Sequence, residues 1–362
     1  MSQPYIIYRP PSHSPSKEST ILNSIVVVYK TPNKNIDKPN PSWNGGETLR
    51  CWLINKMPVP ISVNTFANAP QLSHSKYLRM MHQLDYPTSG VMLYGMDKKT
   101  AGHVARQFES RTVDKLYQSV VVGLDRDAIA RCGDVNKCLG RVLDVGNLLE
   151  VYRREGRRRG KKKRKAGKRG EEYEETAGVP DWCRKENVGV FKDDEGGGVY
   201  ISCPVRENEE GGCDYWCKTV GTEGGGLEME SWGEDEIVRK WELGRGGKTG
   251  WKLAVTKAEF EREIGGGWGL VLRPVTGRRH QLRLHMLSLG GGIKGDATYG
   301  FGEEDNPRMY LNAYEITVKD FDGITERRWN GRDMFEEEGL KDEVRDGESR
   351  GKNVEVKEGD AA

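Results

Sequence analysis

The apolar residues of this chain fall in two separated blocks, and this distribution constrains its fold more than any other feature. They concentrate in about 20–124 and 251–322, whereas Gly, Lys, Arg and Glu dominate 153–250 and the residues after about 323. Hydrophobic residues make up 35% of the chain, below the roughly 45–50% of a typical globular domain. One core must therefore be built from two distant segments.

Short β-branched runs predict the strands of the first block. The run Ile25–Tyr29 is typical of a buried strand, and further strands are expected over 91–94 and 116–123. Between the last two, apolar residues at helical spacing predict a helix that opens at Thr100 and turns Phe108 toward the core.

The second block repeats this pattern. Strands are expected over 269–275 and 310–318, and Thr276 with Gly277 is typical of a turn and cap that open a helix over 278–289. Strands outnumber helices in both blocks. The expected fold is therefore of the α+β class, with a mixed, mostly antiparallel sheet and flanking helices.

This organisation predicts one folded domain in two halves, 21–124 and 251–322. A flexible N-terminus is expected over 1–20, a mostly inserted and partly disordered segment over 125–250, and a charged, disordered tail over 323–362. Within the inserted segment, clusters of glycine interrupt any periodicity long enough to build an element.

A run of basic residues begins the polar stretch. From Arg153 to Arg169 the sequence reads RREGRRRGKKKRKAGKR, and the acidic EEYEE follows, so the net charge of +2 conceals a strong separation of charge. Such runs are usually solvated and disordered. Nuclear import and contact with nucleic acid are the sharper alternatives, and all three stay open.

The seven cysteines indicate neither a disulfide framework nor a metal site. Their number is odd, and no C-x-x-C pair or secretory signal accompanies them. Cys203, Cys213 and Cys217 match no common zinc spacing. No apolar run approaches the ~20 residues of a membrane span, so no membrane partner is expected. We expect a monomeric intracellular protein of the cytoplasm or nucleus, and import into an organelle stays open.

Three polar clusters stand in otherwise apolar surroundings, at 82–85, 115–117 and 278–285. Each has a plain structural explanation. Asp85 can serve as a turn or cap residue, Tyr117 as a strand aromatic, and the arginines as the solvated face of a helix. Taken singly, the clusters favour these explanations.

In combination, the clusters resemble the RluA family of RNA pseudouridine synthases. The chain has HQLDYPTSGVML where the family has HRLDxxTSGLLL, RQFESRTVDKLYQSVVVG where it has QFxxRxVxKxYxAxVxG, and RPVTGRRHQLRLHMLSLGGGIKGDATYG where it has KPxTGRTHQIRVHLxxLGHPIxGDxxYG. With VVVYK and RMYLNAYEI, the resemblance covers about 20–124 and 251–320. HQLD and the segment Ile36-Asp37-Lys38 bring it nearest to a eukaryotic type, the RNA pseudouridylate synthase domain-containing protein 1 type.

The resemblance implies isomerisation of a uridine within rRNA, tRNA or mRNA. The N-glycosidic bond is broken, the uracil turns, and C5 is joined to the ribose. Asp85 aligns with the family's catalytic aspartate, Tyr117 with a tyrosine that packs on the base and is a candidate for deprotonating C5, and Arg283 with the basic residue that pairs with the aspartate. Whether the carboxylate adds to the sugar, attacks the base or assists elimination stays open. RNA is the expected partner, and no metal or organic cofactor is needed.

The residue chemistry agrees with these roles. A carboxylate beside Leu84 needs a nearby cation to stay ionised, and Arg283 would supply it. A uridine in folded RNA must be flipped to reach such a pocket, at a cost on the order of a few kcal/mol. Tyr117 offers a stacking face, and the helix start after Thr276 can hold phosphate. The expected RNA-binding residues are Gln83, Arg278, Arg279 and His280.

The chain also departs from the family pattern. Gln83 replaces the arginine associated with filling the gap left by the flipped base, Gly291-Gly292 replaces His-Pro, and Asn312 replaces a histidine. Loss of a cation can weaken flipping. Two functions therefore stay open: an active synthase, and a catalytically weak or inactive RNA-binding paralogue. Retention of all three catalytic positions favours the enzyme.

Overall fold

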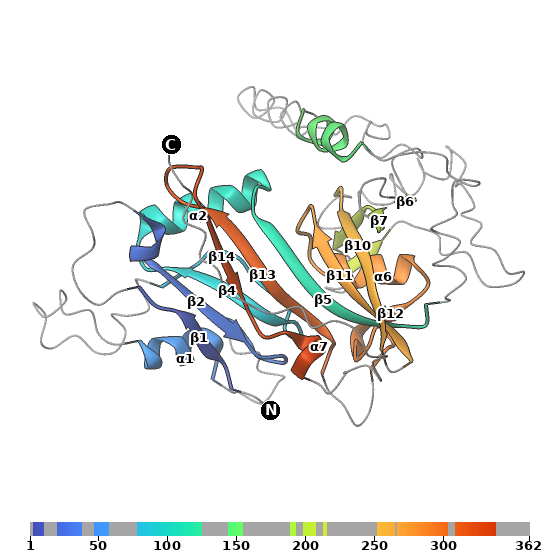
Figure 1. Cartoon of the computed structure of the whole chain (residues 1–362), viewed down its shortest axis with the longest axis horizontal. Helices are drawn as coiled ribbons and strands as arrows, with labels where there is room; N and C mark the ends of the chain where they lie inside the picture. The colour runs from blue at the N-terminus through green and yellow to red at the C-terminus, as the bar shows by residue number, and fades with distance from the viewer. Residues whose placement is uncertain are drawn as a thin grey trace, which may run out of the picture.

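The structure is a computed structural model of the whole chain, and a single mixed sheet dominates it (Figure 1). Twelve strands of the described residues form this sheet. The structure describes residues 3–10, 20–37, 47–57, 78–124, 144–154, 189–192, 198–207, 213–215, 252–264, 266–302 and 308–337.

The strands pair in an order that brings the two sequence blocks together. Along the sheet they are β1 (Tyr5–Tyr8), β2 (Ile25–Lys30), β4 (Ser89–Gly95), β13 (Leu311–Lys319), β5 (Asp114–Val122), β11 (Gly267–Pro274), β10 (Val255–Ile264), β7 (Val199–Ser202) and β6 (Gly189–Lys192). The strands β3 (Arg79–Met80), β12 (Gly292–Ile293) and β14 (Glu326–Asn330) pair beside β4, β5 and β13. Only β4 and β13 pair in parallel among these strands, which confirms the mixed, mostly antiparallel sheet.

Strand β2 is buried on both faces, which explains its continuous apolar run. Ile25 and Val27 pack with β4 and with helix α2 (Lys98–Ser110). Val26 and Val28 point to the opposite face and pack with helix α1 (Leu49–Lys56). The alternation of side chains along one strand thus supplies two separate clusters of the core.

Helix α2 lies close to its predicted position. It begins at Lys98, two residues before the expected start, because the Asp97 side chain accepts a hydrogen bond from the Thr100 amide and caps the helix. Phe108 packs against the core, as predicted. The helix ends at Ser110, and its C-cap residue, Arg111, has a left-handed backbone.

The predicted cap of the second helix is wrong. Helix α6 (Gln281–Ser288) begins three residues after the expected start, with His280 as its N-cap. Thr276 is buried, and its hydroxyl donates a hydrogen bond to Gln281 Oε1 over 2.6 Å. Thr276 therefore stabilises the turn before the helix from the protein interior. The backbone amides around Thr276 do not form a helix N-terminus that faces solvent.

Both chain ends contribute more structure than the sequence predicts. Strand β1 lies in the N-terminal segment expected to be flexible and pairs with β2. Strand β14 and helix α7 (Met334–Glu337) lie in the segment expected to be a disordered tail, and β14 pairs with β13. Trp329 and Phe335 are buried there, so widely spaced aromatic residues anchor a charged segment.

The Phe335 side chain allows a test of this anchor. It is 1% exposed and packs with Val120, Ile264 and Tyr310. Phe335→Ala is expected to lower the free energy of unfolding by about 3–5 kcal/mol, because a large buried ring is lost. Ile324→Ala is the matched control. Ile324 is 82% exposed, so its loss should change stability by less than about 0.5 kcal/mol. Equal urea midpoints for the two variants would contradict the placement of α7.

Part of the predicted insertion joins the sheet. Strands β6 and β7 form an antiparallel pair, and β7 pairs with β10. Helix 145–154 packs against β6 and β10 through Leu148. The expectation that glycine clusters exclude any element from this stretch is therefore wrong for these residues, whereas the insertion itself stays a prediction.

Several sequence features lie outside the described residues. They include most of the basic run, 155–169, and the chain after 337. Cys203 and Cys213 are buried and form no disulfide among the described residues, whereas Cys217 is outside the described ranges. Within those ranges, no group of three or more His, Cys, Asp or Glu is placed to hold a metal ion. No helix among the described residues is long and apolar enough to cross a membrane.

Candidate active site

A cavity of about 1110 Å³ lies over strand β5, where the two halves of the sheet meet. One wall is the loop between β3 and β4, which carries Gln83 and Asp85. The opposite wall is the turn between β11 and α6 together with the first turn of that helix. All seven residues predicted for the site line this cavity: Gln83, Asp85, Tyr117, Arg278, Arg279, His280 and Arg283.

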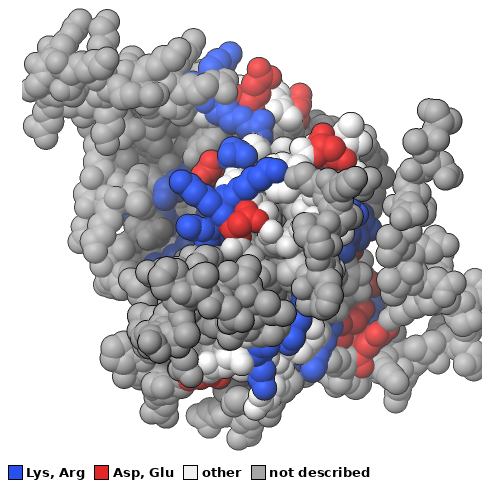
Figure 2. Space-filling model, turned by 90° about the vertical axis from the view of Figure 1, so that its left-hand side faces the viewer, with Lys and Arg blue, Asp and Glu red and all other residues white. Residues whose placement is uncertain are grey.

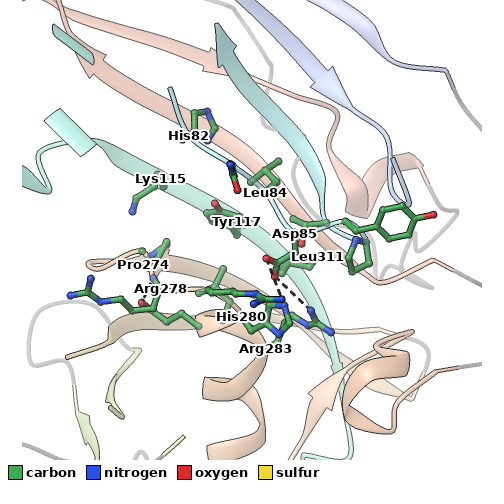
Figure 3. A pocket seen from close by; sticks show the side chains of 18 of the residues that line it. His82, Leu84, Asp85, Lys115, Tyr117, Pro274, Arg278, His280, Arg283 and Leu311 are labelled. Carbon is green, nitrogen blue, oxygen red and sulfur yellow. Dashed lines mark hydrogen bonds and ion pairs between the residues drawn. The ribbon is translucent and has the colours of Figure 1, made fainter. Parts of the chain in front are cut away.

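The Asp85 carboxylate faces α6 across the cavity (Figure 3). One oxygen, Oδ2, is 3.7 Å from Arg283 Nη1, and Oδ1 is 4.0 Å from His280 Nε2. The side chain is 25% exposed. Within the described part of the chain it makes no hydrogen bond to the turn that follows it, because the Thr88 amide donates to the Asp85 backbone carbonyl instead. The geometry therefore gives little support to a capping role.

The turn after Asp85 is fixed by a close approach of two strands. Gly90 has a φ of +127°, and a Cβ there would lie 2.3 Å from the Ala313 carbonyl oxygen. Only glycine fits this position, where β4 meets β13 in parallel. Asn312 is buried beside it and accepts hydrogen bonds of 3.0 Å from both Tyr29 and Ser89. The asparagine that departs from the family pattern thus ties three strands together.

Arg283 has a stronger partner than Asp85. Its Nε and Nη2 atoms donate to the two carboxylate oxygens of Asp296 over 2.7 and 2.6 Å. Both side chains are 2% exposed. Burial alone would lower the pKa of Arg283, but the hydrogen bonds and charge of Asp296 outweigh burial and raise it. Arg283 is therefore a fixed cation whose remaining nitrogen, Nη1, faces Asp85.

His280 and Tyr299 complete this wall. His280 adopts a left-handed backbone (φ 55°) as the N-cap of α6, a conformation that costs a residue other than glycine on the order of 1 kcal/mol. Its Nδ1 is 2.9 Å from the Tyr299 hydroxyl, and the Arg283 guanidinium lies 4.8 Å from the Tyr299 ring centroid. Burial lowers the pKa of His280, and Asp85 opposes this shift. A neutral His280 fits the long 4.0 Å contact.

Tyr117 forms the middle of the cavity floor on β5 (Figure 3). Its neighbours across the sheet are Leu272 on β11 and Ala313 on β13. Burial raises the pKa of the Tyr117 hydroxyl above its usual 10, and the charge of Asp85 raises it further. Because a neutral phenol is a poor base, this environment favours packing of the ring over proton abstraction.

Lys30, at the end of β2, is a buried cation that holds the Asp85 loop. The side chain is 0% exposed, and its ammonium donates to the carbonyl oxygens of Tyr86 and Thr88 over 2.7 and 2.6 Å. It also donates to the Thr31 carbonyl over 3.3 Å. Burial lowers the pKa of Lys30 from 10.5 to about 7, and the charge of Asp85 opposes this shift only in part.

The lowered pKa of Lys30 predicts a dependence of stability on pH. Between about pH 7 and 10.5 the unfolded chain keeps a proton on Lys30 that the folded protein releases. The free energy of unfolding contributed by this residue therefore rises with pH over that window, by at most about 1.4 kcal/mol per unit. In urea unfolding at about pH 7 to 9, the stability of the parent relative to Lys30→Met should grow with pH. A constant difference would contradict this ionisation.

Sequence reasoning missed four polar residues of this region. The sequence could have indicated two of them. Lys30 ends an unbroken apolar strand and is buried there. Asp296 lies in the GDATYG segment of the third motif. Tyr299 belongs to the same segment. Lys115 belongs to the second motif and lines the cavity. Each of these residues lies in or beside a motif, but a motif does not indicate which distant residue its side chain contacts.

A family model for RNA pseudouridylate synthases matches residues 25–288, most of the chain. The chain belongs to this family. The match runs from the start of β2 to the end of α6 and includes the cavity residues from Gln83 to Arg283. The family predicted from the three motifs is confirmed.

Individual relatives of the synthase family match over different lengths. The chain is 47% identical over 70 residues to the dual-specificity RNA pseudouridine synthase RluA of Haemophilus influenzae, which covers 18% of this chain and 32% of the relative. It is 22% identical over 309 residues to the RNA pseudouridylate synthase domain-containing protein 1 of Danio rerio, covering 83% and 72%. A solved structure of the human RNA pseudouridylate synthase domain-containing protein 1 matches with a TM-score of 0.45 and 20% identity over 92% of this chain and 84% of that one. The chain thus spans about a third of the length of the bacterial relative.

Proposed function

We propose that this protein is an RNA pseudouridine synthase that isomerises specific uridines in rRNA, tRNA or mRNA, with Asp85 as the catalytic carboxylate. One observation carries this proposal. The partly exposed Asp85 carboxylate lies in a cavity and faces Arg283, a cation whose position and charge are already fixed by Asp296. Such an arrangement places a fixed cation beside a reactive carboxylate without binding it tightly.

The reaction leaves the composition of the RNA unchanged, because the proton that C5 loses to solvent is replaced by one that N1 takes up. The bond between N1 of uracil and C1′ of ribose breaks, the base rotates, and a bond forms between C5 and C1′. The proton on C5 leaves, and N1 gains one. Asp85 interacts with the reacting nucleotide in this proposal, Arg283 holds the carboxylate, and the ring of Tyr117 supports the base while it turns.

Access of a uridine to this cavity requires flipping out of a base stack. Favourable contacts with the RNA backbone must offset that cost. Figure 2 shows Lys and Arg side chains gathered on the upper part of one face of the molecule, with a few acidic side chains among them. Arg278 and Arg279 line the cavity itself. These cations support RNA as the partner, with no contribution required from the 155–169 segment.

The proposed activity is tested directly with RNA that carries tritium at C5 of uridine. Purified protein should release tritium, because isomerisation removes the C5 hydrogen. Mapping pseudouridine in cellular RNA with and without the protein should then identify the uridine. No release from any RNA and no lost site in cells would overturn the synthase and leave the inactive RNA-binding paralogue.

Gln83 is the residue that keeps the second function open. It is exposed at the cavity rim, where it can donate hydrogen bonds but cannot bring a charge into the vacated base stack. Gln83→Arg is expected to raise the single-turnover rate on a structured RNA more than on a single-stranded one, by roughly tenfold against twofold. Equal effects on both RNAs would show that flipping is not the step that Gln83 limits.

A further inference from the structure

A second group of polar side chains surrounds Tyr152. It lies near one end of the cavity, where Lys115 and Arg278 form the lining. Tyr152 belongs to helix 145–154 and comes from the predicted insertion. The guanidinium of Arg111 lies 4.9 Å from its ring centroid and that of Arg278 lies 5.5 Å from it. Arg278 Nη2 also donates to the Tyr152 hydroxyl over 3.0 Å. We call Arg111, Lys115, Tyr152 and Arg278 the Tyr152 cluster.

Two members of the Tyr152 cluster line the cavity and keep donors available. Arg278 Nε donates to the Leu253 carbonyl over 2.9 Å, which fixes the guanidinium in place. Its remaining nitrogen, Nη1, makes no hydrogen bond within the described residues. The Lys115 ammonium likewise makes no hydrogen bond or ion pair there, and lies within 3.7 Å of the space that a side chain at Gly277 would take.

Arg111 is held in the cluster at a conformational cost. It ends α2 with a left-handed backbone of φ 62°, at a position where glycine is usual. A non-glycine residue there costs on the order of 1 kcal/mol. The Nη1 atom of Arg111 is buried and has no hydrogen-bond partner among the described residues. Strain of this kind is typical of functional sites.

The cluster is strongly positive. Burial lowers the pKa of Lys115 to about 8, and the charges of Arg111 and Arg278 add to that shift. Burial also lowers the pKa of Arg111 to about 10, with Arg278 as a further cause. Asp114, exposed on β5, is the carboxylate that opposes the shift of Lys115. An anion bound between the cations would relieve this repulsion.

We infer that Lys115 and Arg278 bind one backbone phosphate of the RNA beside the target uridine, and that Tyr152 and Arg111 position the Arg278 guanidinium for this contact. Both cations line the cavity that contains Asp85, with Tyr117 between them and the carboxylate in Figure 3. An anionic ligand that enters this cavity with its base at Tyr117 and Asp85 therefore meets them with its backbone. This inference rests on the proposed function for the identity of the ligand.

The test compares Lys115→Met with a matched control, Arg273→Gln. Arg273 is a cation of β11 that is paired with Glu259 and does not line the cavity. Lys115→Met should weaken binding of a uridine-containing RNA about tenfold and reduce the slope of log affinity against log salt by about one, because one phosphate contact is lost. Arg273→Gln should leave both unchanged. An unchanged slope in Lys115→Met, at an unchanged thermal midpoint, would overturn the site.

A second measurement identifies the phosphate. RNAs are prepared with a single neutral methylphosphonate at each position that flanks the target uridine. At one position the neutral linkage should weaken binding by the parent but have no further effect on Lys115→Met, since both changes remove the same contact. Additive losses at every position would overturn the assignment. Tyr152→Phe, which removes only the hydroxyl, should show a weaker form of the same pattern at the same position.

Four outcomes distinguish this inference from its alternatives. Binding of uridine 5′-monophosphate that is lost in Lys115→Met while RNA affinity is unchanged would overturn the RNA site in favour of a free-nucleotide site. Tritium release by the parent with the predicted non-additivity supports both proposals. The non-additivity without tritium release supports the phosphate site and overturns only the synthase, whereas release without it overturns only the phosphate site.

Discussion

Replacing Asp85 by Asn is expected to abolish pseudouridine formation, by about 10³-fold or more, while folding and RNA affinity stay close to those of the parent. The substitution keeps the shape of the side chain and removes its charge. Stability should change little, because the carboxylate is 25% exposed and the charge of Arg283 is already balanced by Asp296. Tritium release and the thermal midpoint, measured on one preparation with one RNA, check both parts.

The structural explanation of Asp85 makes the opposite prediction. A residue that serves only as a turn cap would cost on the order of 1 kcal/mol of stability when replaced, and turnover would continue. A destabilised but fully active Asp85→Asn protein would therefore refute the assignment of the catalytic residue. The absence of a hydrogen bond from this carboxylate to the following turn, within the described residues, favours the catalytic assignment.

Asp296→Asn is expected to lower the free energy of unfolding by about 3–5 kcal/mol. It leaves the Arg283 guanidinium, which is 2% exposed, without its bidentate partner. Activity should fall as well, because the guanidinium that faces Asp85 is no longer held. Urea unfolding measures the first effect, and the single-turnover rate under folding conditions measures the second.

The exposed ion pair between Arg50 and Asp37 supplies the control for this prediction. Their side chains are 28% and 38% exposed, so Asp37→Asn should cost less than about 1 kcal/mol. Adding Arg283→Met to Asp296→Asn should recover part of the lost stability, since the unpaired charge is removed. If Asp296→Asn were no more harmful than Asp37→Asn, the pair would not be a buried one.

The core strands were predictable because their sequences are locally consistent. Strands β2, β4, β5, β11 and β13 lie within a few residues of their expected positions. Their apolar runs are buried on at least one face, so the order of apolar residues in each strand indicates which side chains are buried. The segments that were missed, β1, β14, β6 and β7, are strands of only four or five residues, too short to show a clear alternation of apolar and polar residues. They are stabilised by pairing with a neighbouring strand. The sequence of the segment alone does not indicate that pairing.

The candidate site residues were predicted by resemblance, and their surroundings were not. The three motifs placed Asp85, Tyr117 and Arg283 in one site, and the cavity contains all three. The expected single ion pair is instead a chain of contacts in which Asp296 is the nearest partner of Arg283. Arg283 lies 2.6 Å from Asp296 and 3.7 Å from Asp85, and sequence spacing does not encode which of the two carboxylates comes nearer.

By itself, the sequence determined the class of sheet, the two blocks that supply most of its strands and the family to which the chain belongs. These follow from periodicity and from motifs that are local in the chain. Only the tertiary structure decided that Lys30 holds the Asp85 loop and that Tyr152 of the predicted insertion meets Arg278 at the cavity. Tyr152 and Arg278 are 126 positions apart. Contacts of that kind form because folding brings the segments together, and their strength is set by burial and charge at the meeting point.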